Sequence, residues 1–122
     1  MKVTLHKVFE FAAAQSLPNF PDGHKCHRLH GHTFHVKISV TGDVDPKTGL
    51  YYDHAIISEK MKPIIELLDH SYLNEIPGLE NPTIELSCAW FWEKLDGVLP
   101  GLSEITIHET ERASCSYRGP SA

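Results

Sequence analysis

Four histidines and one cysteine fall within residues 23–32, directly before a segment with strand character. His30 and His32 are separated by one residue, and residues two apart on an extended chain point to the same face. Two adjacent neutral imidazoles form half of a zinc site. Cys26 lies in the loop before them, where a nearby metal or cationic histidine can lower a thiol pKa and create a base or nucleophile. The spacing therefore indicates a metal centre, with solvated loop histidines as the simpler alternative.

Two polar pairs follow predicted elements. Asp69 and His70 come after a predicted helix, where a histidine is compatible with the helix dipole. Glu109 and Thr110 come after a predicted strand. A carboxylate there can accept two hydrogen bonds from the N–H edge of an aminopyrimidine. Without further context, local structure explains both pairs as well as function does.

Period-two alternation and helical periodicity predict the elements that position these residues. The predicted strands cover residues 1–11, 33–41, 102–109 and 114–118. The predicted helices cover residues 55–68 and about 82–95. Asp53 and Asn81 are their predicted caps, and Pro63 is expected to bend the first helix. His30 and His32 share the parity of the apolar residues in the second strand, which places them at the inner end of that face.

The order β-β-α-α-β-β predicts an α+β fold, a four-stranded antiparallel sheet with two helices on one face. The length of 122 residues fits a single domain covering residues 1–122. Leu86, Ala89 and Trp90 are expected on the inner side of the second helix, with Trp92 as a further candidate. The last four residues are expected to be loose.

Composition narrows the class of function. The net charge is −5 and no lysine or arginine cluster is visible, which argues against a nucleic-acid partner. No apolar run is long enough to span a bilayer, and no signal peptide is visible. Three scattered cysteines fit a reducing cytoplasm better than a disulfide framework. We therefore expect a cytoplasmic protein, and its nine histidines again favour a metal.

The segment Cys26-x-x-x-His30-Gly31-His32 resembles the signature of the 6-pyruvoyl-tetrahydropterin synthase family. The short gap between its cysteine and His-Gly-His is similar to the bacterial branch of 6-carboxy-tetrahydropterin synthases. The resemblance covers about residues 9–119. It implies the tunnelling fold, in which sheets of several subunits join into a barrel. It also implies a homohexamer of two trimers, with active sites between subunits.

This resemblance implies a zinc-dependent lyase with a small-molecule partner, a pterin triphosphate. The expected reaction converts 7,8-dihydroneopterin triphosphate to 6-carboxytetrahydropterin, acetaldehyde and triphosphate, in 7-deazaguanine (queuosine) biosynthesis. Formation of the pyruvoyl product is an alternative that the short cysteine-to-histidine gap disfavours. A non-catalytic pterin-binding homologue without its metal is the alternative from another class.

The resemblance also assigns residues by role. Catalysis falls to Cys26, Asp69 and His70, and pterin binding to Glu109, Thr110, Thr83 and Glu85. Chemistry adds candidate cations for the triphosphate, which are Lys25, Arg28 and Arg118. The helix dipole explains an acid in the first turn of a helix, such as Glu85, equally well.

The zinc ligands are the point at which the chain departs from the family. His30 and His32 match two of the three ligating histidines, whereas Gln15 holds the position of the third. A glutamine amide oxygen can bind zinc but is a poorer donor than imidazole. Zinc is therefore expected at His30, His32 and Gln15, and three alternatives stay open: a weaker site, another coordination or no zinc. If the coordination differs, the candidate substitute ligands are His24, His27, His35 and His54.

Overall fold

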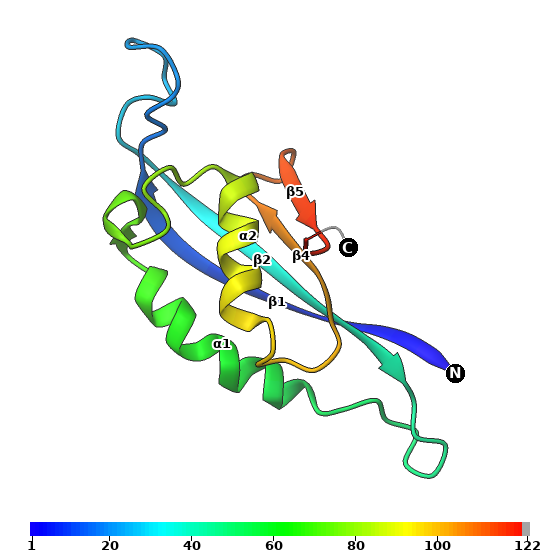
Figure 1. Ribbon diagram of the computed structural model, residues 1–122. Helices are drawn as coiled ribbons and strands as arrows, with labels where there is room; N and C mark the ends of the chain where they lie inside the picture. The colour runs from blue at the N-terminus through cyan, green and yellow to red at the C-terminus, as the bar shows by residue number, and fades with distance from the viewer. Residues whose placement is uncertain (121–122) are drawn as a thin grey trace.

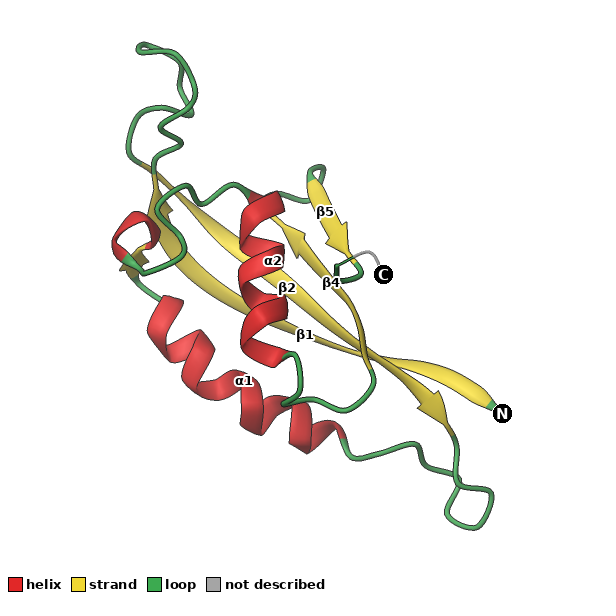
Figure 2. Ribbon diagram, in the orientation of Figure 1, coloured by secondary structure: helices red, strands yellow, loops and turns green. Residues whose placement is uncertain are grey.

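The computed structural model describes residues 1–120, in which two helices cover one face of a five-stranded sheet (Figures 1 and 2). The elements are β1 (Lys2–Gln15), β2 (His30–Asp43), α1 (His54–Leu68), β3 (Ser71–Tyr72), the 3-10 helix η1 (Leu73–Glu75), α2 (Ile84–Leu95), β4 (Leu102–His108) and β5 (Ser114–Tyr117). The strand order is β3-β1-β2-β4-β5. The α+β class is confirmed. The predicted loose end lies partly outside the described residues.

The predicted count of four strands is wrong by one. β3 has two residues and pairs in parallel with Ala13 and Ala14 of β1, while the other neighbouring strands are antiparallel. A two-residue strand has no alternation to detect, so the sequence pattern missed it. β1 and β2 are also longer than predicted, because their pairing continues until Gln15 lies opposite His30.

Alternation along β2 separates the two faces of the sheet. The side chains of Phe34, Val36, Ile38 and Val40 are buried in the core that the helices cover. The neighbouring odd-numbered residues 33, 35 and 37 lie on the opposite face, which carries no helix. β2 therefore presents different residues to two surfaces.

The two helices begin with side-chain caps. The Asp53 carboxylate accepts the Ala55 N–H at 2.8 Å, as predicted. α1 continues through Pro63, whose side chain is exposed. α2 is capped by Thr83 and not by Asn81, because the Thr83 hydroxyl accepts the Leu86 N–H at 3.1 Å. Both helices are therefore anchored at their N-termini by hydrogen bonds.

The buried stripe of α2 differs in part from the prediction. Trp90 is buried as expected, together with Cys88, Phe91 and Leu95. Leu86 is 49% exposed, because it lies off the stripe that runs through Cys88, Phe91 and Leu95. The prediction that Leu86 faces the core is therefore wrong.

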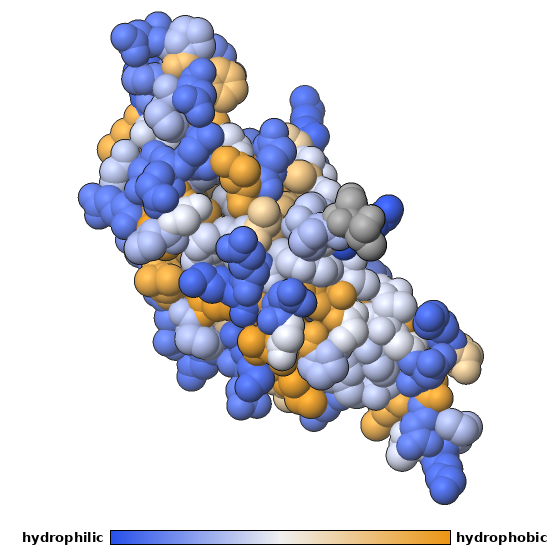
Figure 3. Space-filling view, viewed as in Figure 1, coloured by the Kyte–Doolittle hydropathy of each residue, from blue (hydrophilic) through white to orange (hydrophobic). Residues whose placement is uncertain are grey.

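The loop between β1 and β2 projects beyond one end of the sheet (Figure 1). Most of its visible surface is hydrophilic, whereas hydrophobic residues are scattered over the helix-bearing face (Figure 3). None of the helices in residues 1–120 has the length and apolarity that crossing a bilayer requires.

Candidate metal centre

The sheet gathers polar side chains at the end that carries the projecting loop. Gln15 ends β1, and His30 opens β2 directly opposite it. Glu109 follows β4 and continues the parity of Ile105 and Ile107, which are buried on the helix side. Three segments that are distant in sequence therefore supply one site.

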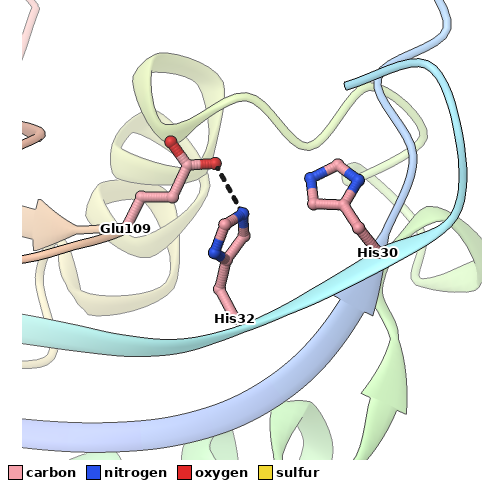
Figure 4. Close-up of side chains that lie close together, drawn as sticks. All are labelled: His30, His32 and Glu109. Atoms are coloured by element: carbon pink, nitrogen blue, oxygen red, sulfur yellow. Dashed lines mark ion pairs between the residues drawn. The ribbon is translucent and has the colours of Figure 1, made fainter. Parts of the chain in front are cut away.

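His30, His32 and Glu109 form the centre of this site (Figure 4). Their ligand atoms all lie within 4.8 Å of one another. His32 Nε2 is 3.2 Å from Glu109 Oε1, and both side chains are 24% exposed. The two imidazole rings are 5.0 Å apart and nearly perpendicular. Two imidazoles and a carboxylate with this spacing can bind a divalent transition metal.

A backbone contact prepares His30 to act as a ligand. Its Nδ1 lies 2.7 Å from the carbonyl oxygen of Arg28. Because a carbonyl can only accept, Nδ1 carries the proton and Nε2 keeps its lone pair. Metal-ligating histidines commonly donate their second nitrogen to such an acceptor, which fixes the ring.

Gln15 contributes a buried amide to the site. Its side chain is 1% exposed, and its Nε2 donates to Glu109 Oε1 at 3.2 Å. Its Oε1 is buried and has no hydrogen-bond partner among the described residues. An unsatisfied buried acceptor costs about 1–3 kcal/mol, so this oxygen favours the arrival of a donor or a cation. The residues present therefore fit a bound metal.

Asp69 and His70 form a pair beside β1. Asp69 Oδ2 lies 2.9 Å from His70 Nδ1, and Asp69 Oδ1 accepts the Ala12 N–H at 2.9 Å. The Ala12 N–H, followed by His70, holds the pKa of the Asp69 carboxyl below its usual value of 3.8. The His70 side chain is 83% exposed, and its backbone has a φ of 60°. Hydrogen bonds therefore hold the Asp69 carboxylate in place, whereas the His70 imidazole is exposed to solvent.

Cys26 lies apart from this pair, in the projecting loop. Its N–H donates to His24 Nδ1 at 3.0 Å, and its carbonyl accepts the Leu17 N–H at 2.9 Å. Within residues 1–120 no hydrogen bond joins its thiol to Asp69 or His70. In the described chain the Cys26 thiol is therefore not hydrogen-bonded to the other two predicted catalytic residues.

The predicted pterin-binding residues have different surroundings. The Thr83 hydroxyl caps α2, and Glu85 is exposed in the first turn of that helix. The Thr110 hydroxyl accepts the N–H groups of Arg112 and Ala113, at 3.2 and 3.1 Å. Glu109 alone of the four belongs to the histidine cluster.

Sequence reasoning missed that Glu109 contacts Gln15 and His32. The Gln15 contact joins residues 94 positions apart. One signal was available, since Glu109 shares the parity of Ile105 and Ile107 and so belongs to the same face. The register between β2 and β4, which brings that face to His32, could not be read from the sequence.

Known proteins resemble this chain over most of its length. The model of the 6-pyruvoyl tetrahydropterin synthase family matches residues 4–120. The chain is 36% identical to the 6-carboxy-5,6,7,8-tetrahydropterin synthase of Synechocystis, over 95% of this chain and 93% of the relative. It is 31% identical to human 6-pyruvoyl tetrahydrobiopterin synthase, over 83% of this chain and 70% of the relative. The solved structure of Caenorhabditis elegans 6-pyruvoyl tetrahydropterin synthase has 29% identity and a TM-score of 0.89, covering 98% of this chain and 97% of that one.

Proposed function

Because the chain belongs to the 6-pyruvoyl tetrahydropterin synthase family, we propose that it is a zinc-dependent 6-carboxy-5,6,7,8-tetrahydropterin synthase. The proposed reaction converts 7,8-dihydroneopterin triphosphate to 6-carboxytetrahydropterin, acetaldehyde and triphosphate, a step toward 7-deazaguanine nucleosides such as queuosine. The main structural support is the cluster of His30, His32 and Glu109 beside buried Gln15. The protein would act in the cytoplasm without a nucleic-acid or membrane partner.

Two observations favour the carboxy product over the pyruvoyl product. The identity to the Synechocystis carboxytetrahydropterin synthase is 36%, compared with 31% to the human pyruvoyl enzyme. The gap from Cys26 to His30 is also short, as in the bacterial branch that the sequence resembles. Both observations support the proposed reaction, which the product assay below tests directly.

In this proposal His30, His32 and the Oε1 atom of Gln15 hold Zn²⁺. The bound ion would polarise the side-chain oxygens of the substrate. As a ligand, His32 Nε2 would have no proton to donate to Glu109 Oε1, which would keep only the N–H of Gln15 Nε2 as its donor. The Glu109 carboxylate can then accept two hydrogen bonds from the aminopyrimidine edge of the pterin. Metal binding at His32 and pterin binding at Glu109 would thereby be linked.

Proton transfer is assigned to Cys26, with Asp69 and His70 tuning its activity. Within one chain the Cys26 thiol makes no hydrogen bond to Asp69 or His70 in the described residues. The projecting loop that carries Cys26 and the exposed His70 are both accessible to another subunit. We therefore propose that a second subunit completes each site, in a homohexamer of two trimers. This arrangement would bring the thiol of one chain to the Asp69–His70 pair of another.

The decisive experiment incubates the purified protein and added zinc with 7,8-dihydroneopterin triphosphate and identifies products by mass spectrometry. Carboxytetrahydropterin with acetaldehyde supports the proposal, whereas the pyruvoyl product supports the alternative enzyme. Cys26→Ala is the matched control and should abolish turnover while leaving the metal content unchanged.

A non-catalytic pterin-binding homologue is the second candidate, and Gln15 at a zinc-ligand position is the observation that favours it. Pterin binding without turnover, at full zinc occupancy, would support this candidate. Turnover by the wild-type protein would exclude it.

A further inference from the structure

The side chain of Asn74 joins two segments beside the histidine cluster. Asn74 lies in η1, and its Oδ1 accepts the Ser16 N–H at 3.0 Å. Its Nδ2 donates to the Ser16 carbonyl oxygen at 2.8 Å and to the Glu80 carbonyl oxygen at 3.2 Å. The amide therefore uses its acceptor oxygen and both of its N–H hydrogens. These three bonds hold the chain at the end of β1 against η1 and the loop before α2.

The contacts of Asn74 begin where the pairing of β1 with β2 ends. Gln15 and His30 are the last pair of that ladder, and Ser16 is the next residue of the chain. The peptide unit between Gln15 and Ser16 is planar, and its N–H is the group that Asn74 Oδ1 binds. The backbone of Gln15 is therefore held by strand pairing on one side and by Asn74 on the other.

A fixed backbone matters at Gln15 because several rotatable bonds separate its Cα from the amide group. The side chain is 1% exposed, and its Oε1 has no hydrogen-bond partner among the described residues. A metal ligand must be held within about 0.5 Å of its productive position. A shift of the Gln15 backbone would move Oε1 away from the two histidines.

Asn74 also ends a strip of chain that runs beside the last part of β1. At the start of the strip, Asp69 Oδ1 accepts the Ala12 N–H at 2.9 Å. β3 pairs with the next two residues of β1, and Asn74 then binds the backbone of Ser16. Residues 69–74 therefore hold residues 12–16 at both ends, with Gln15 next to the Asn74 contact.

We propose that Asn74 is a positioning residue of the metal centre, which sets the Gln15 amide oxygen for metal binding. Asn74 acts through the backbone of Ser16 and not as a ligand. The proposal rests on the proposed function in one respect, since it takes Gln15 as a zinc ligand. It adds a residue from outside the cluster whose effect on zinc affinity depends on Gln15.

The test is a double-mutant cycle on zinc affinity, so it does not depend on turnover. Competition with a chromophoric chelator gives the zinc Kd of the wild type, Asn74→Ala, Gln15→Ala and the double variant. Asn74→Ala should raise the Kd about tenfold, as loss of a partner that orients a metal ligand commonly does. In the Gln15→Ala background the same substitution should leave the Kd unchanged, because the side chain that Asn74 positions is gone.

Ser16→Ala is the matched control. It removes the Ser16 hydroxyl, which lies 3.1 Å from the Tyr72 hydroxyl, but keeps both backbone groups that Asn74 binds. Its zinc Kd should equal that of the wild type. Asn74→Ser is the second variant should Asn74→Ala fail to fold, and the same weakening is expected of it. Thermal unfolding of the metal-free proteins shows which variants are folded at the assay temperature.

Co²⁺ supplies a spectroscopic readout, because its visible absorption depends on the ligands and their geometry. Asn74→Ala should shift the spectrum of the cobalt-loaded protein toward that of Gln15→Ala, whereas Ser16→Ala should leave it unchanged. A wild-type cobalt spectrum in Asn74→Ala would contradict the positioning role.

Two results of the zinc cycle would overturn the proposal. One is an unchanged zinc Kd in Asn74→Ala, and the other is equal weakening in both backgrounds, which would indicate a general structural role. Either result together with turnover by the wild type would leave the proposed function standing. Weakening that depends on Gln15, in a protein that never turns over the substrate, would instead uphold the role of Asn74 and refute the proposed function.

Discussion

Gln15 places an amide where the family resemblance calls for a third imidazole. Its Oε1 is buried without a partner, so it is free to bind a cation but is a weaker zinc donor than histidine nitrogen. Gln15→His should therefore lower the zinc dissociation constant by at least about tenfold. Competition with a chromophoric chelator measures this change.

Gln15→Ala is the companion variant for this test. It should weaken zinc binding if Oε1 is a ligand, because it removes that donor while leaving His30 and His32 in place. Unchanged affinity in Gln15→Ala would instead show that His30 and His32 bind zinc with a different third ligand, for which Glu109 is the nearest candidate.

Cys88 and Cys26 should differ in reactivity. Burial, followed by the neighbouring Cys115, raises the pKa of the Cys88 thiol to about 12. At pH 8 almost all of the Cys88 thiol is then protonated, and only the thiolate is the reactive form. Iodoacetamide should label Cys26 in the native protein and Cys88 only after denaturation. Peptide mass spectrometry checks this order, and native labelling of Cys88 at the Cys26 rate would contradict it.

At the scale of elements, Pro63 is a weak point of α1. It lacks an N–H for the helix ladder and lies on the exposed side, where packing does not demand it. Relative to alanine, proline inside a helix costs about 3 kcal/mol, a figure that already takes the unfolded chain as its reference. Pro63→Ala should therefore raise the free energy of unfolding by up to about 3 kcal/mol.

Urea denaturation measures this gain, and the neighbouring exposed variant Lys62→Ala serves as control. A Pro63→Ala protein no more stable than Lys62→Ala would show that the helix already adapts to the proline without cost.

The faces of the long strands could be predicted from the sequence, because alternation is a local property. Burial of Phe34 and Val36, with His30 and His32 on the same side, followed from parity alone. β3 could not be predicted, since its two residues are in the sheet only through pairing with β1. The cap of α2 was misplaced by two residues because Asn81 and Thr83 are both good capping residues, and local sequence does not distinguish them.

The candidate site was predictable only in part for the same reason. The spacing of His30 and His32 is local, and it pointed to the correct face. The approach of Glu109 to Gln15 depends on the registers of β1 with β2 and of β2 with β4, which no local pattern encodes.

At the scale of the whole molecule, the open edges of the sheet predict assembly. β1 has fourteen residues, but β3 pairs with only two of them, so most of that edge has no strand partner in the described chain. β5 leaves a four-residue edge on the other side. Exposed Leu67 and Leu86 add apolar surface on the helices. Unpaired edges of this kind favour pairing with another chain.

If the proposed homohexamer forms, light scattering after size exclusion should give about six times the chain mass of 13.7 kDa. Dilution should dissociate the assembly and abolish turnover together, if Cys26 and the Asp69–His70 pair come from different chains. A fully active monomer would contradict both the hexamer and the shared site.

β2 carries His32 on one face and Thr33, His35 and Lys37 on the other. Loss or gain of a single residue within this strand would exchange the two sets and turn His32 away from Glu109. Evolution can therefore vary the length of the chain before His30, in the projecting loop, but not between His32 and Lys37. Across related genomes, insertions and deletions should accumulate in the loop and be absent from this short interval of β2.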